Sequence, residues 1–284
     1  MFIARQTLHD ARSAERNVMV KNISLLTERT TWRAPAAYKH AAPGAKQVES
    51  SMSLPFKRFT NSQPSANLKL KPGMKRMSNS EQLNLFRQSL QTQMSDYNMD
   101  LSVEVVAQLA IYYELLLRWN ERLHLVSPCS PEEFAARHVL ESLTLLNHLP
   151  EQATVIDIGS GAGLPIVPCL IARNDISATL IEASQKKSVF LREALKTADA
   201  LNRATIVAKR FEDLSPPNAQ FISCRALDDF STQLSTLVRW ALPGTTLLLF
   251  GSENLRQTLT DLHCDPQQFL LPGSDRRFLF KADL

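Results

Sequence analysis

Three glycines and one aspartate lie close together in a stretch suited to binding a charged nucleoside. The 284-residue chain has only eight glycines, yet Gly159, Gly161 and Gly163 occupy alternate positions within five residues. Asp157 precedes them at the end of a short apolar run that is rich in β-branched residues. Backbone without Cβ adopts unusual dihedral angles and lets a ligand approach the main chain closely. The pattern therefore predicts a strand that runs into a tight glycine turn.

The spacing of this turn discriminates between two classes of nucleotide cofactor. The dinucleotide fingerprint is G-x-G-x-x-G/A, whereas here the order is D-x-G-x-G-x-G, and Leu164 stands where the last glycine of that fingerprint belongs. A helix that begins near Leu164 or Pro165 would direct free N–H groups toward the same crevice. Asp157 would repel a pyrophosphate but attract a cationic aminoacyl group. The turn therefore favours S-adenosylmethionine over a nicotinamide dinucleotide.

A second acid follows at the distance that a ribose ligand requires. The apolar run 178–181 ends in Glu182, about twenty residues beyond the turn, where an acid binds the ribose hydroxyls. Both cofactor classes share this acid, so it supports nucleoside binding without choosing between them. The alternative is an ordinary strand-to-helix turn without a ligand. The joint register of Asp157, the glycines and Glu182 argues against that alternative.

The elements that must position these residues alternate between strand and helix. Strands are predicted near residues 153–158, 178–182, 205–208, 220–224, 245–250 and 277–281. Helices are predicted near residues 165–173, 186–200, 229–240 and 253–262. This alternation is typical of an α/β fold with a parallel sheet, in which the ligand crevice lies at the carboxyl ends of the strands.

Further helices are predicted before the glycine turn. From Val105 to Leu123 the apolar residues recur at steps of four and three, which marks one face of a helix. A second helix fits residues 131–147, with Ser130 as its N-cap and a proline in its first position. Ser80 is a candidate cap for a helix that would begin at the next residue.

Composition limits the classes of protein and of site. No apolar run approaches the roughly 20 residues that cross a bilayer, so we expect no membrane protein. The four cysteines, Cys129, Cys169, Cys224 and Cys264, are widely separated and form no C-x-x-C pair. We expect reduced thiols, mostly in the core, and neither a zinc site nor another metal site.

Charge divides the chain near residue 76. Residues 1–76 carry fourteen Lys and Arg against four Asp and Glu, a net charge of +10, whereas residues 77–284 carry eighteen against twenty-four, a net charge of −6. Low hydrophobicity without a helical or strand period predicts that 1–76 is a basic, disordered extension. Three interpretations of it stay open: an upstream start or dispensable extension, an organelle transit peptide, or an RNA-binding arm.

Several short segments, taken together, resemble one protein family. They are Leu-Arg-Trp-Asn at 117–120, Leu-Val-Ser at 125–127, Arg-His-Val-Leu-Glu-Ser at 137–142, the glycine turn at 157–165, Glu-Ala-Ser-Gln-Lys-Lys at 182–187 and Cys-Arg-Ala at 224–226. In this order they resemble the bacterial small-subunit ribosomal RNA guanine-N7 methyltransferases, also called glucose-inhibited division protein B. The resemblance covers about residues 83–251.

The resemblance implies a fold and an activity. It implies an α/β, Rossmann-like class I S-adenosylmethionine-dependent methyltransferase core at 151–284, with a helical cover at 77–150. It implies an enzyme, an rRNA (guanine-N7)-methyltransferase, whose partner is 16S ribosomal RNA or the 30S subunit. The expected compartment is the cytoplasm, or an organelle if residues 1–76 contain a transit peptide. Guanine N7 has a lone pair and no proton, so we predict catalysis by positioning and name no acid or base.

The resemblance also implies site residues. Matching positions give cofactor contacts at Gly159, Leu164, Phe211, Glu212 and Arg225, and they agree with the acids found above. The predicted cofactor set is Asp157, Gly159, Gly161, Gly163, Leu164, Glu182, Phe211, Glu212 and Arg225. Arg210 and Arg225 are candidate RNA contacts, because a guanidinium pairs bidentately with the guanine edge or with phosphate. The alternative for each is a surface salt bridge.

Three positions depart from the family pattern. His124 replaces an asparagine, Ile166 replaces a glycine, and Phe250 replaces a lysine before Gly251. Two other functions stay open. One is a different S-adenosylmethionine-dependent methyltransferase that acts on a small molecule or protein, and the other is a non-catalytic relative that binds RNA or the ribosome. An NAD oxidoreductase ranks last, because the glycine spacing is wrong for it.

Other polar and aromatic residues have competing interpretations. We expect His138, one helical turn before Glu141, to have a hydrogen-bonded structural role, since no second histidine stands at i+4 to complete a metal site. Trp119 either packs in the core or stacks on a flipped base. The pair Lys186 and Lys187 is either a solvated helix start or a phosphate contact.

Overall fold

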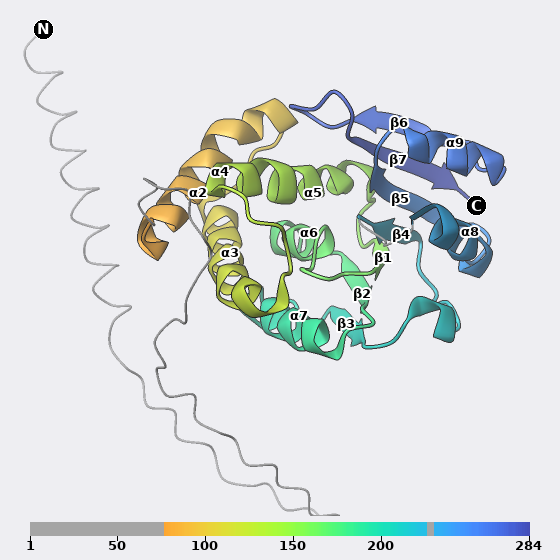
Figure 1. Cartoon of the computed structure of the whole chain (residues 1–284), viewed down its shortest axis with the longest axis horizontal. Helices are drawn as coiled ribbons and strands as arrows, with labels where there is room; N and C mark the ends of the chain where they lie inside the picture. Colours follow the sequence, from red (N-terminus) through yellow and green to blue (C-terminus); the bar gives the residue numbers. More distant parts are fainter. Residues whose placement is uncertain (1–76, 226–229) are drawn as a thin grey trace, which may run out of the picture. The chain divides into compact units, whose positions relative to one another are not determined.

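The computed structural model describes residues 77–225 and 230–284. The predictions made for residues 1–76 lie outside the described residues. The described part begins with helices and continues as strands alternating with helices, as the colour gradient from orange to blue shows (Figure 1).

Seven strands of the described chain form one sheet in the order β3-β2-β1-β4-β5-β7-β6. They are β1 (Thr154–Ile158), β2 (Ser177–Ile181), β3 (Ala204–Val207), β4 (Phe221–Cys224), β5 (Thr246–Gly251), β6 (Gln267–Leu270) and β7 (Phe278–Asp283). Strands β1 to β5 pair in parallel, as predicted. The prediction of a parallel sheet is wrong for β7, which runs antiparallel to both β5 and β6.

The strand order reverses direction at β1. The chain moves outward from β1 through β2 to β3 and then returns to the other side of β1 with β4. Crossovers on either side of such a reversal leave the sheet on opposite faces, which opens a crevice at the carboxyl ends of the two central strands. The glycine turn and Arg225 follow directly on β1 and β4, so both lie at this edge of the sheet.

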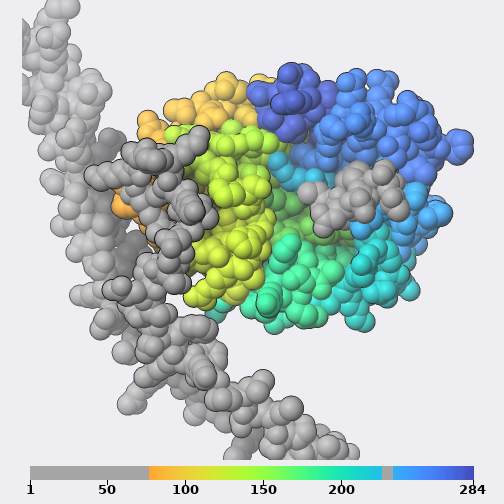
Figure 2. Space-filling view, in the orientation of Figure 1, coloured from red at the N-terminus to blue at the C-terminus, as the bar shows by residue number. Residues whose placement is uncertain are grey.

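Helices cover both faces of the sheet. Those of the core are α6 (Ile166–Ala172), α7 (Gln185–Thr197), α8 (Phe230–Trp240) and α9 (Asn254–Asp261), with the short turn η4 (Phe211–Asp213). Those of the cover are α2 (Asn79–Gln93), η1 (Met94–Tyr97), α3 (Val103–Leu123), α4 (Pro131–Glu133), η2 (Phe134–Leu140), α5 (Glu141–Leu143) and η3 (Thr144–His148). In Figure 2 the yellow-green surface of α3 meets the green surface of α7, which it contacts.

The pleat of the strands divides the apolar side chains between two cores. Val155 and Leu248 face the core that includes α3, α6 and α7, whereas their neighbours Ile156 and Leu249 face the core that includes α8 and α9. Successive side chains of a strand point to opposite faces, so a sheet covered on both faces has nearly continuous apolar strands. The sequence of β5, Thr-Leu-Leu-Leu-Phe-Gly, has this character.

The start of α2 corrects one prediction. The N-cap is Ser78 and not Ser80, because Ser78 and Glu81 form a reciprocal capping box. The Ser78 Oγ accepts from the Glu81 N–H at 3.3 Å, and a Glu81 carboxylate oxygen accepts from the Ser78 N–H at 2.7 Å. This box requires the serine to stand three residues before the glutamate. Ser130 caps α4, as predicted.

The helical run 131–148 is not one regular helix. Its middle segment, η2, has the wider π-helical turn, and the N–H of Glu141 donates to the carbonyl of Ala136, five residues back. The apolar spacing gave no sign of this turn. π-Helical turns are frequent at functional sites, so this one directs attention to residues 137–142.

Three further findings concern the expected absences and the thiols. No helix in residues 77–225 and 230–284 has the length and hydropathy needed to cross a membrane. The same residues contain no group of three or more His, Cys, Asp or Glu side chains that could hold a metal ion. All four cysteines are free, and three of them, Cys169, Cys224 and Cys264, are buried, which agrees with the expected reduced core thiols.

Candidate functional site

The glycine turn has the backbone that the sequence predicts. Gly159, Gly161 and Gly163 have φ angles of 66°, 50° and 82°, a region that residues with a Cβ rarely adopt. The N–H of Gly159 donates to the carbonyl of Ile181 at 2.9 Å, which holds the turn against the end of β2. A Cβ added at Gly163 would lie 2.5 Å from the Val167 Cγ2 atom. The third glycine therefore also permits close packing of α6.

Asp157 supplies a buried carboxylate with one free oxygen. Its side chain is 1% exposed, and Oδ1 accepts a hydrogen bond from the Ser223 hydroxyl at 2.7 Å. Among the described residues, Oδ2 has no hydrogen-bond partner. Burial raises the pKa of this carboxyl to about 7. An orphaned carboxylate oxygen at this position favours a donor or cation that the chain itself does not supply.

Glu182 ties the turn to the next strand and keeps capacity for a ligand. One carboxylate oxygen accepts from the Gly161 N–H at 2.8 Å, and the other accepts from the Ser184 N–H at 2.7 Å. The side chain is 7% exposed. A carboxylate has about four acceptor positions, so each oxygen can accept one more hydrogen bond. Glu182 is thus able to bind a pair of vicinal hydroxyls, as predicted for a ribose.

The helical cover reaches the turn directly. The hydroxyl of Tyr112, a fully buried residue of α3, donates to the carbonyl of Ala162 at 2.7 Å. Burial raises the pKa of Tyr112 well above its usual range, so the hydroxyl stays protonated and available as a donor. The cover therefore fixes the backbone of the glycine turn, a role that the sequence did not indicate.

Arg225 is held by the segment 137–142 of the cover. Its Nη2 donates to a carboxylate oxygen of Glu141 at 2.8 Å and to the carbonyl of Arg137, and its Nη1 donates to the Ser142 hydroxyl at 3.3 Å. The guanidinium carbon lies 5.3 Å from the centre of the Phe250 ring. The predicted alternative of a surface salt bridge is wrong for Arg225, because its ion pair with Glu141 is largely buried.

Glu141 joins three segments that are far apart in sequence. Its second oxygen accepts from the Nε of Arg277 at 2.8 Å. The Glu141 side chain is 1% exposed, whereas the Arg225 and Arg277 side chains are 17% and 32% exposed. The carboxylate thus bridges the end of β4 and the start of β7 from within the cover. The motif Arg-His-x-x-Glu-Ser drew attention to Glu141, but nothing in the sequence predicted that Arg277 pairs with it.

The residues that follow β3 have separate surroundings. Phe211 is 4% exposed, and its ring packs against Trp240 with centroids 5.5 Å apart. Its side chain is therefore part of the core. Arg210 is largely exposed and pairs with Glu212 at 2.8 Å. This exposed pair is the surface salt bridge considered for Arg210.

The departures from the family pattern have local structural settings. His124 ends α3 with a φ of 48°, a left-handed conformation that asparagine favours and histidine also adopts. Ile166 is fully buried at the start of α6. Phe250 is 5% exposed and lies beneath Arg225. A lysine at that position would place a second positive charge near the guanidinium.

The contacts of Trp119 and His138 test two of the remaining predictions. Trp119 packs on α7: its Nε1 donates to Glu193 at 3.1 Å, and its ring meets Phe190 edge-on. The expected hydrogen-bonded role of His138 is wrong for Nδ1, which is buried and has no partner among the described residues. Lys186 is exposed and Lys187 is half-buried at the start of α7, so their two interpretations stay open.

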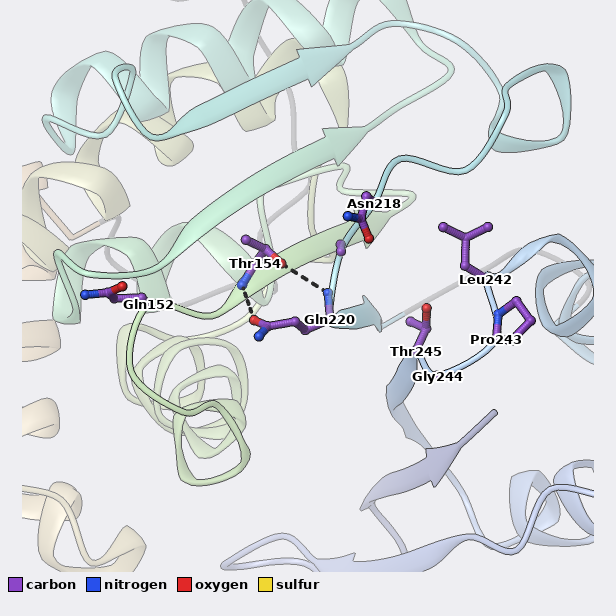
Figure 3. A pocket seen from close by; sticks show the side chains of 9 residues that line it. Gln152, Thr154, Asn218, Gln220, Leu242, Pro243, Gly244 and Thr245 are labelled. Carbon is purple, nitrogen blue, oxygen red and sulfur yellow. Dashed lines mark hydrogen bonds between the residues drawn. The ribbon is translucent and has the colours of Figure 1, made fainter.

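A separate hollow lies at the other end of the strands, away from the glycine turn. It has a volume of about 410 Å³, and Figure 3 shows its polar lining around Thr154, Asn218 and Gln220 at the amino ends of β1 and β4. Thr154 and Gln220 already bond to each other there. Ligands of open α/β sheets bind at the carboxyl ends of the strands. This hollow is therefore not the nucleoside crevice.

The residues at the carboxyl ends fit the expected cofactor in their chemistry. The unpartnered oxygen of Asp157 suits a cationic amino group, and the spare acceptor positions of Glu182 suit ribose hydroxyls. The structure brings the turn, Asp157 and Glu182 together, with Arg225 at the end of the adjacent strand. Phe211 and Glu212 follow β3, beyond β2.

Comparison with known proteins decides the family. The family model described as rRNA small subunit methyltransferase G (GidB) matches residues 105–268, more than half of the chain. The chain belongs to this family. A Gluconobacter oxydans protein named ribosomal RNA small subunit methyltransferase G is 38% identical over 170 residues, which cover 58% of this chain and 84% of that protein. A Neisseria meningitidis protein of the same name is 31% identical over 156 residues, which cover 55% and 73%.

Membership in the methyltransferase G family confirms the predicted fold class, enzyme class and cofactor. The core is a Rossmann-like α/β fold, and the chain is a methyltransferase that uses S-adenosylmethionine. Among solved structures, a SAM-dependent methyltransferase from Aquifex aeolicus aligns with a TM-score of 0.44 and 16% identity, over 53% of this chain and 92% of that chain.

Proposed function

We propose that this protein transfers the methyl group of S-adenosylmethionine to N7 of one guanine in 16S ribosomal RNA. Family membership supports the substrate class, small-subunit ribosomal RNA. The observation that carries the proposal is the glycine turn with two buried acids, Asp157 and Glu182, at the carboxyl ends of β1 and β2. The choice of N7 comes from the resemblance described above.

The chain's own residues act by binding and orientation. The cofactor supplies an electrophilic methyl group, and N7 supplies a lone pair without a proton to remove. Asp157 and Glu182 would hold the amino group and the ribose, and the backbone of Phe211 and Glu212 would contact the rest of the nucleoside. Such fixed orientation of two reactants is by itself a large part of catalysis. No side chain is therefore assigned as an acid or base.

We assign the remaining parts of the chain to the same function. Arg210 and Arg225 are the proposed RNA contacts, and the exposed Lys186 lies near the crevice edge at the start of α7. Residues 77–150 form the proposed cover and residues 151–284 the core, while residues 1–76 are an extension. The proposed compartment is the cytoplasm, or an organelle if that extension is a transit peptide.

The experiment that tests the function measures both transfer and product. Labelled S-adenosylmethionine is incubated with 30S particles that lack the endogenous modification, with naked 16S RNA and with free nucleosides. We expect label in 7-methylguanosine from ribosomal RNA, and we expect its loss in Asp157→Ala. Comparison of the particle with naked RNA identifies the substrate form.

Two outcomes would contradict the proposal. Equal transfer to free nucleosides and to 30S particles would indicate a methyltransferase of small molecules. Intact cofactor binding without any transfer would indicate a non-catalytic relative that binds RNA or the ribosome.

A further inference from the structure

We propose that Glu141 is a positioning residue, and that the segment 137–142 is a receptor that holds the Arg225 guanidinium beside the cofactor turn. The inference rests on the proposed function, since it concerns the same crevice. It assigns a role to the motif Arg-His-x-x-Glu-Ser, which the cofactor contacts leave unexplained. It also explains why this segment contains a π-helical turn.

The receptor for the guanidinium is a set of three hydrogen-bond acceptors from one short segment. The carboxylate of Glu141, the carbonyl of Arg137 and the hydroxyl of Ser142 each accept from the guanidinium of Arg225. In a regular α-helix the N–H of Glu141 would donate to the carbonyl of Arg137, four residues back. Here that N–H donates to the carbonyl of Ala136 instead, in the wide η2 turn. The π-helical turn thus removes the Glu141 N–H from the Arg137 carbonyl, and this carbonyl accepts from Arg225.

The strand register places Arg225 next to the cofactor turn. Ile158 pairs with Cys224 across β1 and β4, so the next residues, Gly159 and Arg225, leave the sheet side by side. Cys224 belongs to the core beneath α8 and α9, and the pleat therefore directs Arg225 toward the cover. The helical cover therefore holds the guanidinium of Arg225, while the backbone of Arg225 lies beside the glycine turn.

The guanidinium has donors to spare. Of its five N–H groups, three have the acceptors named above, and the Nε–H and one Nη1–H have no acceptor in residues 77–225 and 230–284. The centre of the Phe250 ring lies 5.3 Å from the guanidinium carbon, and this cation–π contact uses none of the N–H donors. An arginine clamped in this way presents its remaining donors in a fixed direction.

Arg277 offers a matched control. It bonds to the same carboxylate at the same distance of 2.8 Å, but it comes from the start of β7 and not from the strand that adjoins the turn. Arg277→Gln and Glu141→Gln both break the buried bridge. Only Glu141→Gln removes the anion that holds Arg225.

The test measures cofactor affinity by calorimetry, thermal unfolding, and the kcat and KM of methyl transfer to 30S particles, all with the full chain. We expect both variants to unfold at lower temperature. Glu141→Gln alone should weaken S-adenosylmethionine binding, on the order of tenfold, and lower kcat/KM by about 10- to 100-fold, the scale of a misplaced positioning group. Arg277→Gln should bind the cofactor within about twofold of wild type, because that change leaves the Arg225 pair intact.

Two further variants examine whether Glu141 acts through Arg225. Glu141→Asp keeps the charge and should recover part of the lost affinity. The double variant Glu141→Gln/Arg225→Gln should bind the cofactor no more weakly than Arg225→Gln, because both changes break the same interaction and their losses of affinity should not add. If Glu141→Gln does not fold, this double variant still removes the unpaired charge. Ser142→Ala then removes one acceptor, with an expected loss of a few-fold.

The inference is overturned if Glu141→Gln and Arg277→Gln lower stability alike while cofactor affinity and kcat/KM stay at wild-type values. Fully additive losses in the double variant would also overturn it. Failure of the proposed function would look different from failure of this inference. The wild type would then bind the cofactor without methylating RNA, and the cofactor affinities of Glu141→Gln and Arg277→Gln would still test the role of Glu141.

Discussion

Asp157 has an environment that penalises its own charge. Its carboxyl is 1% exposed, the Ser223 hydroxyl donates to it, and the nearby Glu182 opposes its ionisation. Burial raises its pKa from 3.8 to about 7. The charged form of Asp157 is therefore poorly solvated until a ligand binds. Such perturbed groups gather at functional sites.

The raised pKa predicts how stability changes with pH. Between about pH 4 and pH 7 the folded protein keeps a proton that the unfolded chain has lost, so the free energy of unfolding should fall as pH rises through this range. The loss is on the order of 1.4 kcal/mol for each unit of pKa shift. Urea unfolding of the cofactor-free protein at pH 5 and pH 8 measures it. Asp157→Asn should flatten this dependence, and an equal slope in both proteins would contradict the assignment.

Cofactor binding should show the opposite dependence on pH. If the ionised Asp157 receives the amino group, the affinity for S-adenosylmethionine should increase as pH rises from about 6 toward 7.5, because a larger fraction of the carboxyl is then charged. Calorimetric titration at several pH values measures this change. An affinity that is flat over this range would show that the amino group binds elsewhere.

At the scale of elements, the glycine turn and α6 are fitted to each other. Gly163 and Gly244 have nearly equal φ angles of 82° and 81°, but an added Cβ would meet Val167 at 2.5 Å at the first and nothing within 4 Å at the second. Gly244→Ala should cost about 1–2 kcal/mol for the left-handed backbone. Gly163→Ala should cost about 1–3 kcal/mol more from overpacking. Urea unfolding compares them, and equal losses would refute the packing argument.

The contact between the cover and the turn gives a second prediction for elements. Tyr112→Phe removes the donor to the Ala162 carbonyl and leaves a buried acceptor unpaired, at a cost of about 1–3 kcal/mol. Tyr113→Phe is the control: Tyr113 is 2% exposed and stacks on Phe86, and its hydroxyl has no bond within the described residues. We expect a smaller loss of stability and unchanged cofactor affinity for the control. The same response in both variants would exclude a special role for Tyr112.

The sequence predicts those elements whose pattern is local. Alternating apolar runs and helical periods located β1 to β5, β7, α3 and α6 to α9 within a few residues. The strand β6, Gln-Gln-Phe-Leu, was missed because it is an edge strand whose residues are mostly exposed, so it lacks a buried face. The π-helical turn η2 was missed because its apolar spacing resembles that of an α-helix.

In the site, too, the sequence predicts the residues whose spacing is local and misses those that meet only through the fold. Asp157, the glycines and Glu182 were predicted because a strand-turn-helix unit and its neighbour fix their spacing in sequence. The bridge from Glu141 to Arg225 and Arg277 was not predicted, since those residues are separated by more than fifty positions and meet only through strand order. The direction of β7, which brings Arg277 to the bridge, had no local signal.

At the scale of the whole molecule, charge is divided unevenly between the two parts of the chain. The described part belongs to residues 77–284, whose net charge is −6, whereas residues 1–76 carry +10. Phosphate contacts dominate affinity for nucleic acid and weaken with salt. An acidic RNA enzyme therefore needs local basic residues such as Lys186 and Lys187, or the basic extension.

Removal of both sources of positive charge should weaken RNA binding. We expect a chain that begins at Met77 and carries Lys186→Gln and Lys187→Gln to bind 16S RNA less tightly, with a smaller dependence on salt, while its cofactor affinity is unchanged. Filter binding at several salt concentrations measures both quantities. The truncation without the lysine changes separates the two sources, and unchanged RNA binding in the combined variant would contradict the charge argument.

The inner position of β7 has a consequence for the order in which the chain can fold. β6 precedes β7 in the sequence, yet its neighbour in the sheet is β7, which also pairs with β5. While a ribosome extends the chain, the outer edge of β5 has no partner and β6 has no place in the sheet until residue 283 has emerged. Unpaired edges of this kind are where partly folded chains associate. We expect the parallel half of the sheet to form first and the last hairpin to close it.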